Sequence, residues 1–414
     1  MAVPLTMTDK HQNWREDFPI FQSKMNGKPL VYLDTASSAQ KPNAVIDKMT
    51  SLMNSHYSNI HRGLYAISQN LTEEYEAVRS KVSRFLNISS DYSVVFTRNT
   101  TEAINLVAQS WGNEFLEEGS EIILSELEHH ANIVPWQLIS EQKSANVKYI
   151  PLIEDQELNL EEFKKLLSDK TKIVCVNHIS NSLGIINNIQ AIIAITKEFN
   201  PNIKVLIDGS QSVVHGSVDL SQIGADFYVF TGHKLYGPTG VGCLVAKTSI
   251  LEQMPPYQGG GDMIETVSFD SSTFKEPPYK FEAGTPAIME VIGLGAAIDY
   301  LSSKNMDDIA EYEHNLLLSA SVKMRELDGM RIYADIEGKA PIISFTAEWA
   351  HISDIAMILD QCGVAVRSGH HCCMPLMQKF GIEGTIRASF GLYNTMEDID
   401  IFIDGLNKAK KMLA

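Results

Sequence analysis

The sequence lacks any long hydrophobic run. Within its 414 residues, no stretch approaches the roughly 18 uninterrupted apolar residues that a membrane-spanning helix needs. The first residues are polar and contain no apolar core of the kind found in a secretory signal, so we expect none. Hydrophobic residues make up 44% of the chain and charged residues 21%, which is ordinary for a globular protein. We therefore expect a globular protein of the cytoplasm.

Positive charge is also scarce. Lys and Arg together number 34 against 51 Asp and Glu, so the formal net charge is -17. This acidic balance argues against sequence-independent binding of nucleic acid and against binding to an anionic membrane surface. A local basic pocket for a phosphate remains compatible with it.

Cysteines are few, and their number is odd. The five are widely spread: Cys175, Cys243, Cys362, Cys372 and Cys373. This usage is typical of reduced thiols in a cytosol. Cys372 and Cys373 are neighbours, and their Cα atoms would lie about 3.8 Å apart, below the usual disulfide range of about 4.4–6.8 Å. We therefore interpret them as two free thiols.

Short apolar segments alternate with helical patterns along most of the chain. This alternation predicts an α/β fold with a mostly parallel sheet covered on both faces, whose ligands bind at the carboxyl ends of the strands. The predicted strands are 93–97, 121–124, 173–177, 205–208, 227–230 and 242–246, and the predicted helices are 72–86, 101–111, 190–199, 293–301, 307–326 and 396–413.

The pattern changes near residue 290, which indicates a division of the chain. We expect a large cofactor-binding domain at 25–292 and a smaller α+β domain at 293–414, with residues 1–24 packing against the small domain. The Gly- and Pro-rich stretch 255–286 is expected to form loops at the domain border, where functional residues tend to lie.

Lys234 is the first candidate for chemistry. It follows the apolar strand 227–230 in the turn TGHKLYGPTG, and another apolar strand comes next. A lysine on a surface turn is usually only solvated, but a lysine buried between strands needs a partner or a covalent role. Asp208 ends the preceding strand and could simply cap a helix. Together, a desolvated lysine and a strand-end acid are what pyridoxal phosphate requires.

Two further segments fit such a site. Thr100 and Thr101 lie between a strand and a helix, where they could be plain caps or part of an anion site. His129, in the segment EHHAN after the strand 121–124, could stack on a planar cofactor or be an ordinary buried histidine. We discount a metal site there, because adjacent histidines rarely converge on one ion.

The segment RSGHHCCMP places two cysteines among histidines and next to an arginine. Electropositive, exposed surroundings favour a thiolate, so we expect a reactive thiol, although composition does not choose between Cys372 and Cys373. Arg387 lies among apolar residues. It suits either a substrate carboxylate or a structural ion pair.

With these segments in view, the chain resembles the fold-type I pyridoxal phosphate enzymes of the class V aminotransferase superfamily, and within it the SUF-type (group II) cysteine desulfurases, which include selenocysteine lyases. The resemblance rests on YLDTASSAQKP, HRGLY, NTTEAINLVAQSWG, EHHANIVPW, ISNSLG, IDGSQSVVH, TGHKLYGPTGVG, FEAGTP, RSGHHCCMP and IRASFGLYN. The short Arg-x-Gly-x-His-Cys loop is the most specific of these.

The resemblance implies a role for each matching position. Lys234 would bond to the cofactor, Asp208 would hold the pyridinium nitrogen, Gln211 the ring hydroxyl, and His129 would stack on the ring. Cys372 would form the persulfide, because it directly follows His371; Cys373 departs from relatives that carry a small residue there. The phosphate would be held by Thr100, Thr101, Thr231, His233 and, from the partner subunit of a homodimer, Thr285, and the substrate by Asn181, Arg387, Arg367 and His61.

The implied reaction converts L-cysteine to L-alanine and leaves sulfur on Cys372 for iron–sulfur cluster assembly. A SufE-like or SufU-like protein would accept the sulfur. The alternatives are a selenocysteine lyase and another class V lyase or aminotransferase. A metal or thiol carrier using residues 370–373 is disfavoured, because contiguous ligands lack the spacing that wraps a tetrahedral ion.

Overall fold

The computed structural model describes residues 14–154 and 156–414. Residues 1–13 lie outside the described part. They include most of the polar stretch in which no secretory signal is expected, and half of the expected N-terminal segment.

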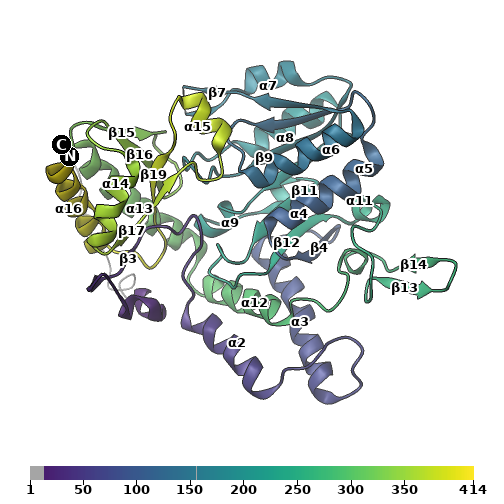
Figure 1. Cartoon of the computed structure of the whole chain (residues 1–414). Helices are drawn as coiled ribbons and strands as arrows, with labels where there is room; N and C mark the ends of the chain where they lie inside the picture. The colour runs from purple at the N-terminus through teal and green to yellow at the C-terminus, as the bar shows by residue number, and fades with distance from the viewer. Residues whose placement is uncertain (1–13, 155) are drawn as a thin grey trace.

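A seven-stranded sheet forms the centre of the larger part of the molecule (Figure 1). Only β12 runs antiparallel to its neighbours; the other neighbouring pairs are parallel. A turn without a helix joins β11 to β12, and such a short connection can join only antiparallel strands. In spatial order the strands are β4 (Tyr92–Thr97), β12 (Gly242–Lys247), β11 (Phe227–Thr231), β10 (Lys204–Asp208), β9 (Thr171–Asn177), β5 (Glu121–Ser125) and β6 (Asn146–Ile150).

All six predicted strands occur within two residues of their predicted limits. The sequence analysis missed β6, which lies at the edge of the sheet and is only partly buried. Its lysine and asparagine weaken the apolar signal that the central strands carry. The prediction therefore works best where both faces of a strand are covered.

Side chains alternate between two apolar cores along the strands. On β10, for example, Val205 and Ile207 belong to one core and Leu206 to the other. Residues of α3 (Ala66–Phe85), α8 (Ile189–Phe199) and α12 (Ile288–Ser302) complete the first core, and residues of α4 (Thr100–Leu106) and α6 (Val134–Lys143) complete the second. The sheet is thus buried on both faces, as a parallel sheet requires.

The predicted helices are present, with three differences, one of which is that α12 begins at Ile288, five residues earlier than predicted. Helix α3 begins six residues earlier than predicted, and the helix predicted at 101–111 continues as α4, a π-helical turn at Val107–Trp111 and α5. The helices around the large sheet are α2 (Asn43–Ser55), α3 (Ala66–Phe85), α4 (Thr100–Leu106), α5 (Gly112–Phe115), α6 (Val134–Lys143), α7 (Leu160–Leu166), α8 (Ile189–Phe199), α9 (Ser212–His215), α10 (Leu220–Ile223), α11 (Thr248–Gln253) and α12 (Ile288–Ser302).

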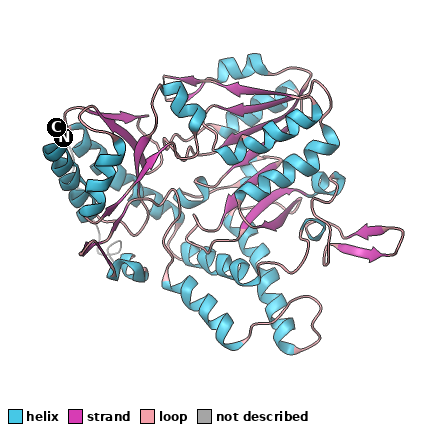
Figure 2. Cartoon of the chain, in the orientation of Figure 1, coloured by secondary structure: helices cyan, strands magenta, loops and turns pink. Residues whose placement is uncertain are grey.

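A second, four-stranded antiparallel sheet lies in the C-terminal part of the chain, with its helices beside it (Figure 2). Its strands are β15 (Met330–Tyr333), β16 (Ile342–Ala347), β19 (Thr385–Ser389) and β18 (Arg367–Gly369); its helices are α13 (Met306–Arg325), α14 (Ile352–Gln361), α15 (Met374–Phe380) and α16 (Met396–Leu413). The short strand β3 (Val31–Tyr32) pairs in parallel with β17 (Val364–Ala365). The remaining short pairs are β1 (Lys24–Met25) with β2 (Lys28–Pro29), and β7 (Leu152–Ile153) with β8 (Glu157–Leu158).

The start of the described chain contacts this second unit. Arg15 forms an ion pair with Asp398 at 2.8 Å, and the ring of Phe18 packs edge-on against Tyr393 with centroids 5.0 Å apart. The expected border at 292/293 falls inside α12, which packs on α2 and α3 beneath the large sheet. The division into domains at 24/25 and 292/293 therefore stays a prediction.

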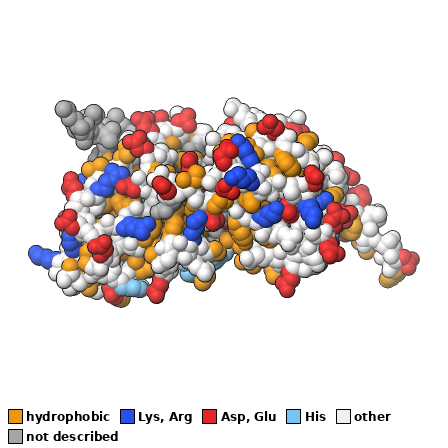
Figure 3. Space-filling model, turned by 90° about the horizontal axis from the view of Figure 1, so that it is seen from above, with side chains coloured by type: hydrophobic (Ala, Val, Ile, Leu, Met, Phe, Trp, Pro, Cys, Tyr) orange, Lys and Arg blue, Asp and Glu red, His pale blue; other side chains and the backbone are white. Residues whose placement is uncertain are grey.

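The stretch 255–286 is not loop alone. It contains a β-hairpin of β13 (Ile264–Val267) and β14 (Ser272–Phe274), which projects from the body of the molecule in Figure 2. Among the described residues, no helix is long and apolar enough to cross a bilayer. Basic and acidic side chains are interspersed on the face that Figure 3 shows.

Candidate active site

The carboxyl ends of the central strands place polar side chains side by side. Asp208 at the end of β10 is in register with Asn177 at the end of β9. Thr231 ends β11, the strand on the other side of β10, and leads into the turn that carries Lys234. The parallel register therefore brings residues far apart in sequence to one edge of the sheet.

A glycine allows the amino end of α4 to approach the same edge. A Cβ atom at Gly242 would lie 2.7 Å from the backbone of Asn99, so no larger residue fits there without displacing the segment. The side chain of Asn99 caps α4 by accepting the Glu102 N–H at 2.9 Å. Thr100 and Thr101 thereby present the first N–H groups and hydroxyls of the helix at the strand ends.

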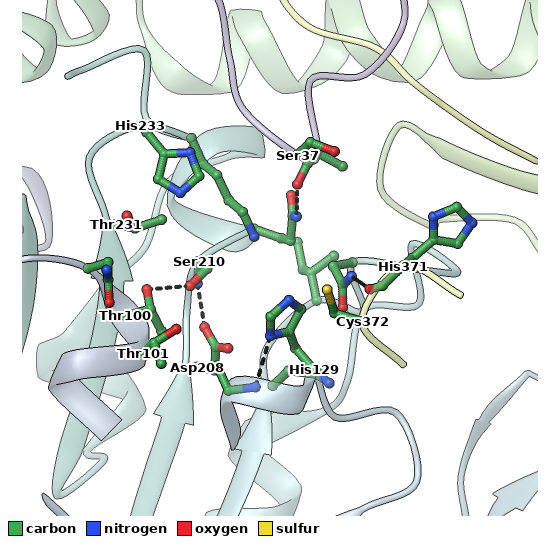
Figure 4. A pocket seen from close by; sticks show the side chains of 18 of the residues that line it. Ser37, Thr100, Thr101, His129, Asp208, Ser210, Thr231, His233, His371 and Cys372 are labelled. Atoms are coloured by element: carbon green, nitrogen blue, oxygen red, sulfur yellow. Dashed lines mark hydrogen bonds between the residues drawn. The ribbon is translucent and has the colours of Figure 1, made fainter. Parts of the chain in front are cut away.

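These elements enclose a cavity of about 180 Å³. Thr100, Thr101 and Thr231 lie at one end of it and Cys372 at the other, with Asp208 and His129 between (Figure 4). The residues that line it are Ala36, Ser37, Asn99, Thr100, Thr101, His129, Ala131, Asn177, Ile179, Asn181, Asp208, Ser210, Gln211, Thr231, His233, Lys234, Arg367, His371, Cys372 and Arg387.

Several buried polar atoms in this cavity lack a partner in the described part of the chain. They are Thr231 Oγ1, Gln211 Oε1, His371 Nδ1 and Arg387 Nε. Leaving such atoms unsatisfied is costly, so their presence in one cavity indicates a polar ligand. By contrast, Thr100 and Ser210 share a hydroxyl hydrogen bond of 2.7 Å, and the Ser210 N–H donates to Asp208 Oδ1 at 2.9 Å.

Lys234 lies in this cavity without a hydrogen bond or ion pair to any described residue. Burial lowers the pKa of its ammonium group, and Arg387 lowers it further, whereas Asp208 acts in the opposite direction. A lowered pKa favours the unprotonated amine, which can act as a nucleophile or a base. Beside it, burial lowers the pKa of His233 to about 4, and the charge of Lys234 adds to the effect.

His129 is neutral in this environment. Burial and then Lys234 lower its pKa to about 3. Its Nδ1 accepts the Ala131 N–H at 3.0 Å, so the ring proton must be on Nε2. The hydrogen bond at Nδ1 also fixes the ring plane at the cavity wall. A flat, neutral ring held in this way suits stacking on a planar ligand.

Arg387 forms the structural ion pair that was one of its two predicted roles, and it also lines the cavity. It is only 2% exposed, donates to Asp34 Oδ1 at 3.0 Å and to Ser37 Oγ at 2.7 Å, and still lines the cavity with an unpartnered Nε. Asp34 also pairs with the more exposed Arg367, at 3.4 Å. The ion pair therefore orients a guanidinium group that remains available to an anionic ligand.

The structure distinguishes the two adjacent cysteines. Cys372 is half-buried and lines the cavity, whereas Cys373 is fully buried outside it. The Cys373 thiol donates weakly to Asn181 Oδ1 at 3.4 Å, and burial raises its pKa to about 12. The sequence left open which cysteine of this segment is the reactive thiol. The burial of Cys373, whose side chain lies in the apolar core, disfavours its thiolate.

Three of the expected site residues, Asn181, Thr285 and His61, differ from the others in their position or their contacts. The side-chain amide of Asn181 donates to the His371 carbonyl at 2.8 Å, so it holds the cysteine segment in place. Thr285 lines a second cavity, and His61 forms an ion pair with Glu76 at 3.0 Å outside the first cavity. Within one chain, the structure does not bring Thr285 or His61 to Lys234, and their roles stay predictions.

The sequence analysis missed several residues of the site. Asp34 and Ser37, which orient Arg387, lie in the quoted segment YLDTASSAQKP, but nothing local identifies them. Ser210 directly follows Asp208 and Gly209, so its position after a strand end was the one available signal. Within the described residues, no cluster of His, Cys, Asp and Glu could hold a metal ion.

Comparison with known proteins identifies the class of this site. A profile described as aminotransferase class-V matches residues 31–402, and the chain therefore belongs to that family. Curated relatives include cysteine desulfurases of Salmonella newport (strain SL254) and Salmonella typhi. Each is 45% identical over 408 residues, which cover 98% of this chain and 100% of the relative.

Two solved structures are similar over nearly their whole length. The cysteine desulfurase CsdA of Escherichia coli aligns with a TM-score of 0.91 and 36% identity, covering 99% of this chain and 100% of that one. The cysteine desulfurase of Thermococcus onnurineus NA1 aligns with a TM-score of 0.90 and 32% identity, covering 100% and 99%.

Enzymes of this family depend on pyridoxal phosphate, and the residues of the cavity fit that cofactor. The cofactor carries a phosphate, a ring hydroxyl and an aldehyde. The unpartnered oxygen of Thr231 can bind the phosphate, that of Gln211 can bind the ring hydroxyl, and the free Lys234 amine can bond to the aldehyde. Asp208, which also lines the cavity, carries the carboxylate that a protonated ring nitrogen requires.

Proposed function

We propose that this protein is a SUF-type cysteine desulfurase. It takes the sulfur of L-cysteine onto Cys372, releases L-alanine and supplies the sulfur for iron–sulfur cluster assembly. The observation that carries the proposal is that an unpaired lysine, an oriented arginine and a half-buried cysteine share one small cavity. The 45% identity to cysteine desulfurases over the full length supports it.

The residues of this chain divide the work as follows. Pyridoxal phosphate, when bound, supplies an acceptor for the electron pair released at the α-carbon of an amino acid. Asp208 would hold a proton on the ring nitrogen, and Thr100, Thr101, Thr231 and His233 would hold the phosphate. His129 would stack on the ring and Gln211 would bind its hydroxyl. These residues set the orientation of the cofactor before substrate enters.

Other residues of the cavity would position the substrate. Arg387, held by Asp34 and Ser37, would bind the carboxylate of L-cysteine, and Arg367 would add positive charge at the entrance. The Lys234 amine would bind the cofactor aldehyde in the resting enzyme and take the α-proton of the substrate once free. Its pKa, lowered by burial, suits a base near neutral pH.

Sulfur transfer falls to Cys372. Its thiolate would attack the substrate sulfur, so that a sulfur–sulfur bond forms as the sulfur–Cβ bond breaks. The electron pair of the broken bond stays with the three-carbon product, which leaves as alanine after it takes up a proton. The persulfide on Cys372 would then pass to a SufE-like or SufU-like acceptor protein.

We also propose that the enzyme is a homodimer. Thr285 lies with Arg98 on a second cavity, and the loop before α3, whose His61 shares a further cavity with Gly284 and Pro286, exposes Leu64 and Tyr65 by 93% and 54%. Large exposed apolar side chains favour a protein interface. A partner copy seated there would bring its Thr285 to the phosphate end of the neighbouring site.

The test is the formation of alanine from L-cysteine by the wild type and by Lys234→Ala. We expect the variant to form none, because the cavity then lacks its base. Lys280→Met is the matched control: Lys280 is also buried with a lowered pKa, but it lies outside the cavity and donates to the Glu252 carbonyl. Full activity of Lys234→Ala would refute the proposal, and faster turnover of selenocysteine than of cysteine would favour a selenocysteine lyase.

A further inference from the structure

The cysteine loop, residues 370–373 between β18 and α15, has an unusual backbone. His371 and Cys372 are consecutive and both lie in the left-handed region, with φ of 52° and 57°. Residues other than glycine rarely adopt this conformation, and two in succession persist only where the surroundings hold them. The contacts around the loop should therefore decide whether Cys372 stays in the cavity.

Two histidine rings hold the loop through its backbone amides. The Cys372 N–H donates to His370 Nδ1 at 3.1 Å, and the Met374 N–H donates to His130 Nε2 at 3.0 Å. In return, the backbone N–H of His130 donates to the Cys372 carbonyl at 2.8 Å. A backbone amide can only donate, so both ring nitrogens must be unprotonated for these bonds to exist.

Protonation would break both bonds. A proton on His130 Nε2 or His370 Nδ1 would face an amide hydrogen, so an attraction would become a repulsion. The two rings are also neighbours, with centroids 5.6 Å apart, so that two charged rings would repel each other. Burial and then His370 lower the pKa of His130, which keeps this ring neutral at neutral pH.

Among the other titratable groups around the loop, Glu128 is buried, and burial raises its pKa to about 8. Its protonation is common to the wild type and the variants, so its effect cancels in a ratio of their rates. Burial lowers the pKa of His129 and His371 to about 3, so both stay neutral in mild acid. Lys379 on α15 forms an ion pair with Glu126, which follows β5, and this pair joins the same two elements as the histidines. The Arg367 guanidinium stays charged and pairs with Asp34.

Two more groups on the neighbouring elements are fixed by hydrogen bonds. Glu128, just before the histidines, is buried and accepts from Asn132 Nδ2 at 2.6 Å and from the Asn177 N–H at 2.9 Å. The Cys373 thiol is buried with a raised pKa and stays protonated. Of the groups around the loop, His130 and His370 are the two whose ring nitrogens accept hydrogen bonds from the loop's own backbone amides.

We propose that His130 and His370 are positioning residues that hold Cys372 in the cavity while both rings are neutral, and that protonation of His130 releases the cysteine loop. In the released state the sulfur on Cys372 reaches solvent, where an acceptor protein can take it. This inference rests on the proposed role of Cys372 as the sulfur carrier. The hydrogen bonds to the loop, however, can be tested without turnover.

The test measures the rate at which iodoacetamide alkylates Cys372 in the holoenzyme at about pH 8 and about pH 5.5. The rate of each variant is divided by that of the wild type at the same pH, so that the thiolate fraction common to both proteins cancels. Mass spectrometry locates the label. At the higher pH we expect His130→Ala to react about fivefold faster than wild type, the factor that one neutral hydrogen bond contributes. At the lower pH the ratio should approach one, because the wild-type loop is then released as well.

His130→Gln separates the proposal from a structural role, because its side-chain oxygen can accept the Met374 N–H but cannot be protonated. It should match wild type at the higher pH and react more slowly than wild type at the lower pH. The control is His351→Asn: His351 Nδ1 also accepts a backbone N–H, from Ser353 at 3.2 Å, but at the start of α14. It should match wild type at both values.

A His130→Ala ratio that is the same at both pH values would overturn the proposal, as would a His130→Gln variant that behaves like His130→Ala. Because alkylation needs no substrate, failure here would leave the desulfurase assignment standing. Failure of alanine formation in the wild type would refute that assignment and leave the loop measurement valid.

Discussion

Replacing each of the two adjacent cysteines separately should give opposite results. Cys372 lines the cavity, whereas Cys373 is 0% exposed. We expect Cys372→Ala to lose persulfide formation and most sulfide release from L-cysteine, and Cys373→Ala to keep both. Alanine is small enough to take the place of Cys373 without a clash, so the second variant should remain folded.

The magnitude follows from the thiol pKa. Burial raises that of Cys373 from 9.0 to about 12. Each pKa unit changes the thiolate population about tenfold, so near neutral pH the Cys373 thiolate is about a thousandfold rarer than that of an ordinary thiol. Since the thiolate is the nucleophile, Cys373 cannot support more than about a thousandth of the wild-type rate even if it reached the substrate.

The assay follows alanine and sulfide together after L-cysteine is added to wild type, Cys372→Ala and Cys373→Ala, with the persulfide located by mass spectrometry of the intact proteins. A Cys373→Ala variant that loses the persulfide while Cys372→Ala keeps it would refute the reasoning. Equal partial losses in both variants would show that the two thiols exchange sulfur, which the burial of Cys373 forbids.

Three further predictions concern two ion pairs and a buried histidine. Asp34→Asn removes the carboxylate that orients Arg387, so the KM for L-cysteine should rise about tenfold with little change in kcat, as steady-state kinetics would show. Glu282→Ala leaves the guanidinium of Arg79, 12% exposed, without its bidentate partner at 2.6 and 2.7 Å, and should lower the free energy of unfolding by about 3 kcal/mol or more in urea titrations. Burial lowers the pKa of His371 to about 3 from 6.5, so the unfolded chain binds the extra proton first; stability should fall as the pH drops from about 6.5 towards 3, by up to about 1.4 kcal/mol per pH unit, and His371→Asn should show a shallower slope.

Local patterns were enough to predict most of the fold. Buried strands such as β9, β10 and β11 are continuous apolar runs, and α8 between β9 and β10 repeats apolar residues at helical spacing, so each was predicted within two residues of its observed limits. The short helices α9 and α10 were not predicted. The position of β12 was predicted but not its antiparallel direction, which depends on the short connection to β11, and the edge strand β6 was missed because it is partly exposed.

Part of the candidate site could also be predicted from the sequence. Lys234, Asp208, Thr100 and His129 each follow the end of a strand, and parallel strands bring such positions to one edge. The sequence therefore predicted that these four residues would lie in one site, and they line the same cavity. The roles of Thr285 and His61 come from resemblance alone, since one chain does not bring them to the cavity.

By itself, then, the sequence determined the elements, the edge of the sheet where the site lies and the candidates for its chemistry, because these depend on residues close together in the chain. Only the tertiary structure decided between Cys372 and Cys373, paired Asp34 with Arg387 and set two histidine rings against the cysteine loop. The physical reason is that burial and hydrogen-bond partners depend on neighbours hundreds of residues away, so two adjacent thiols can differ in burial and in reactivity.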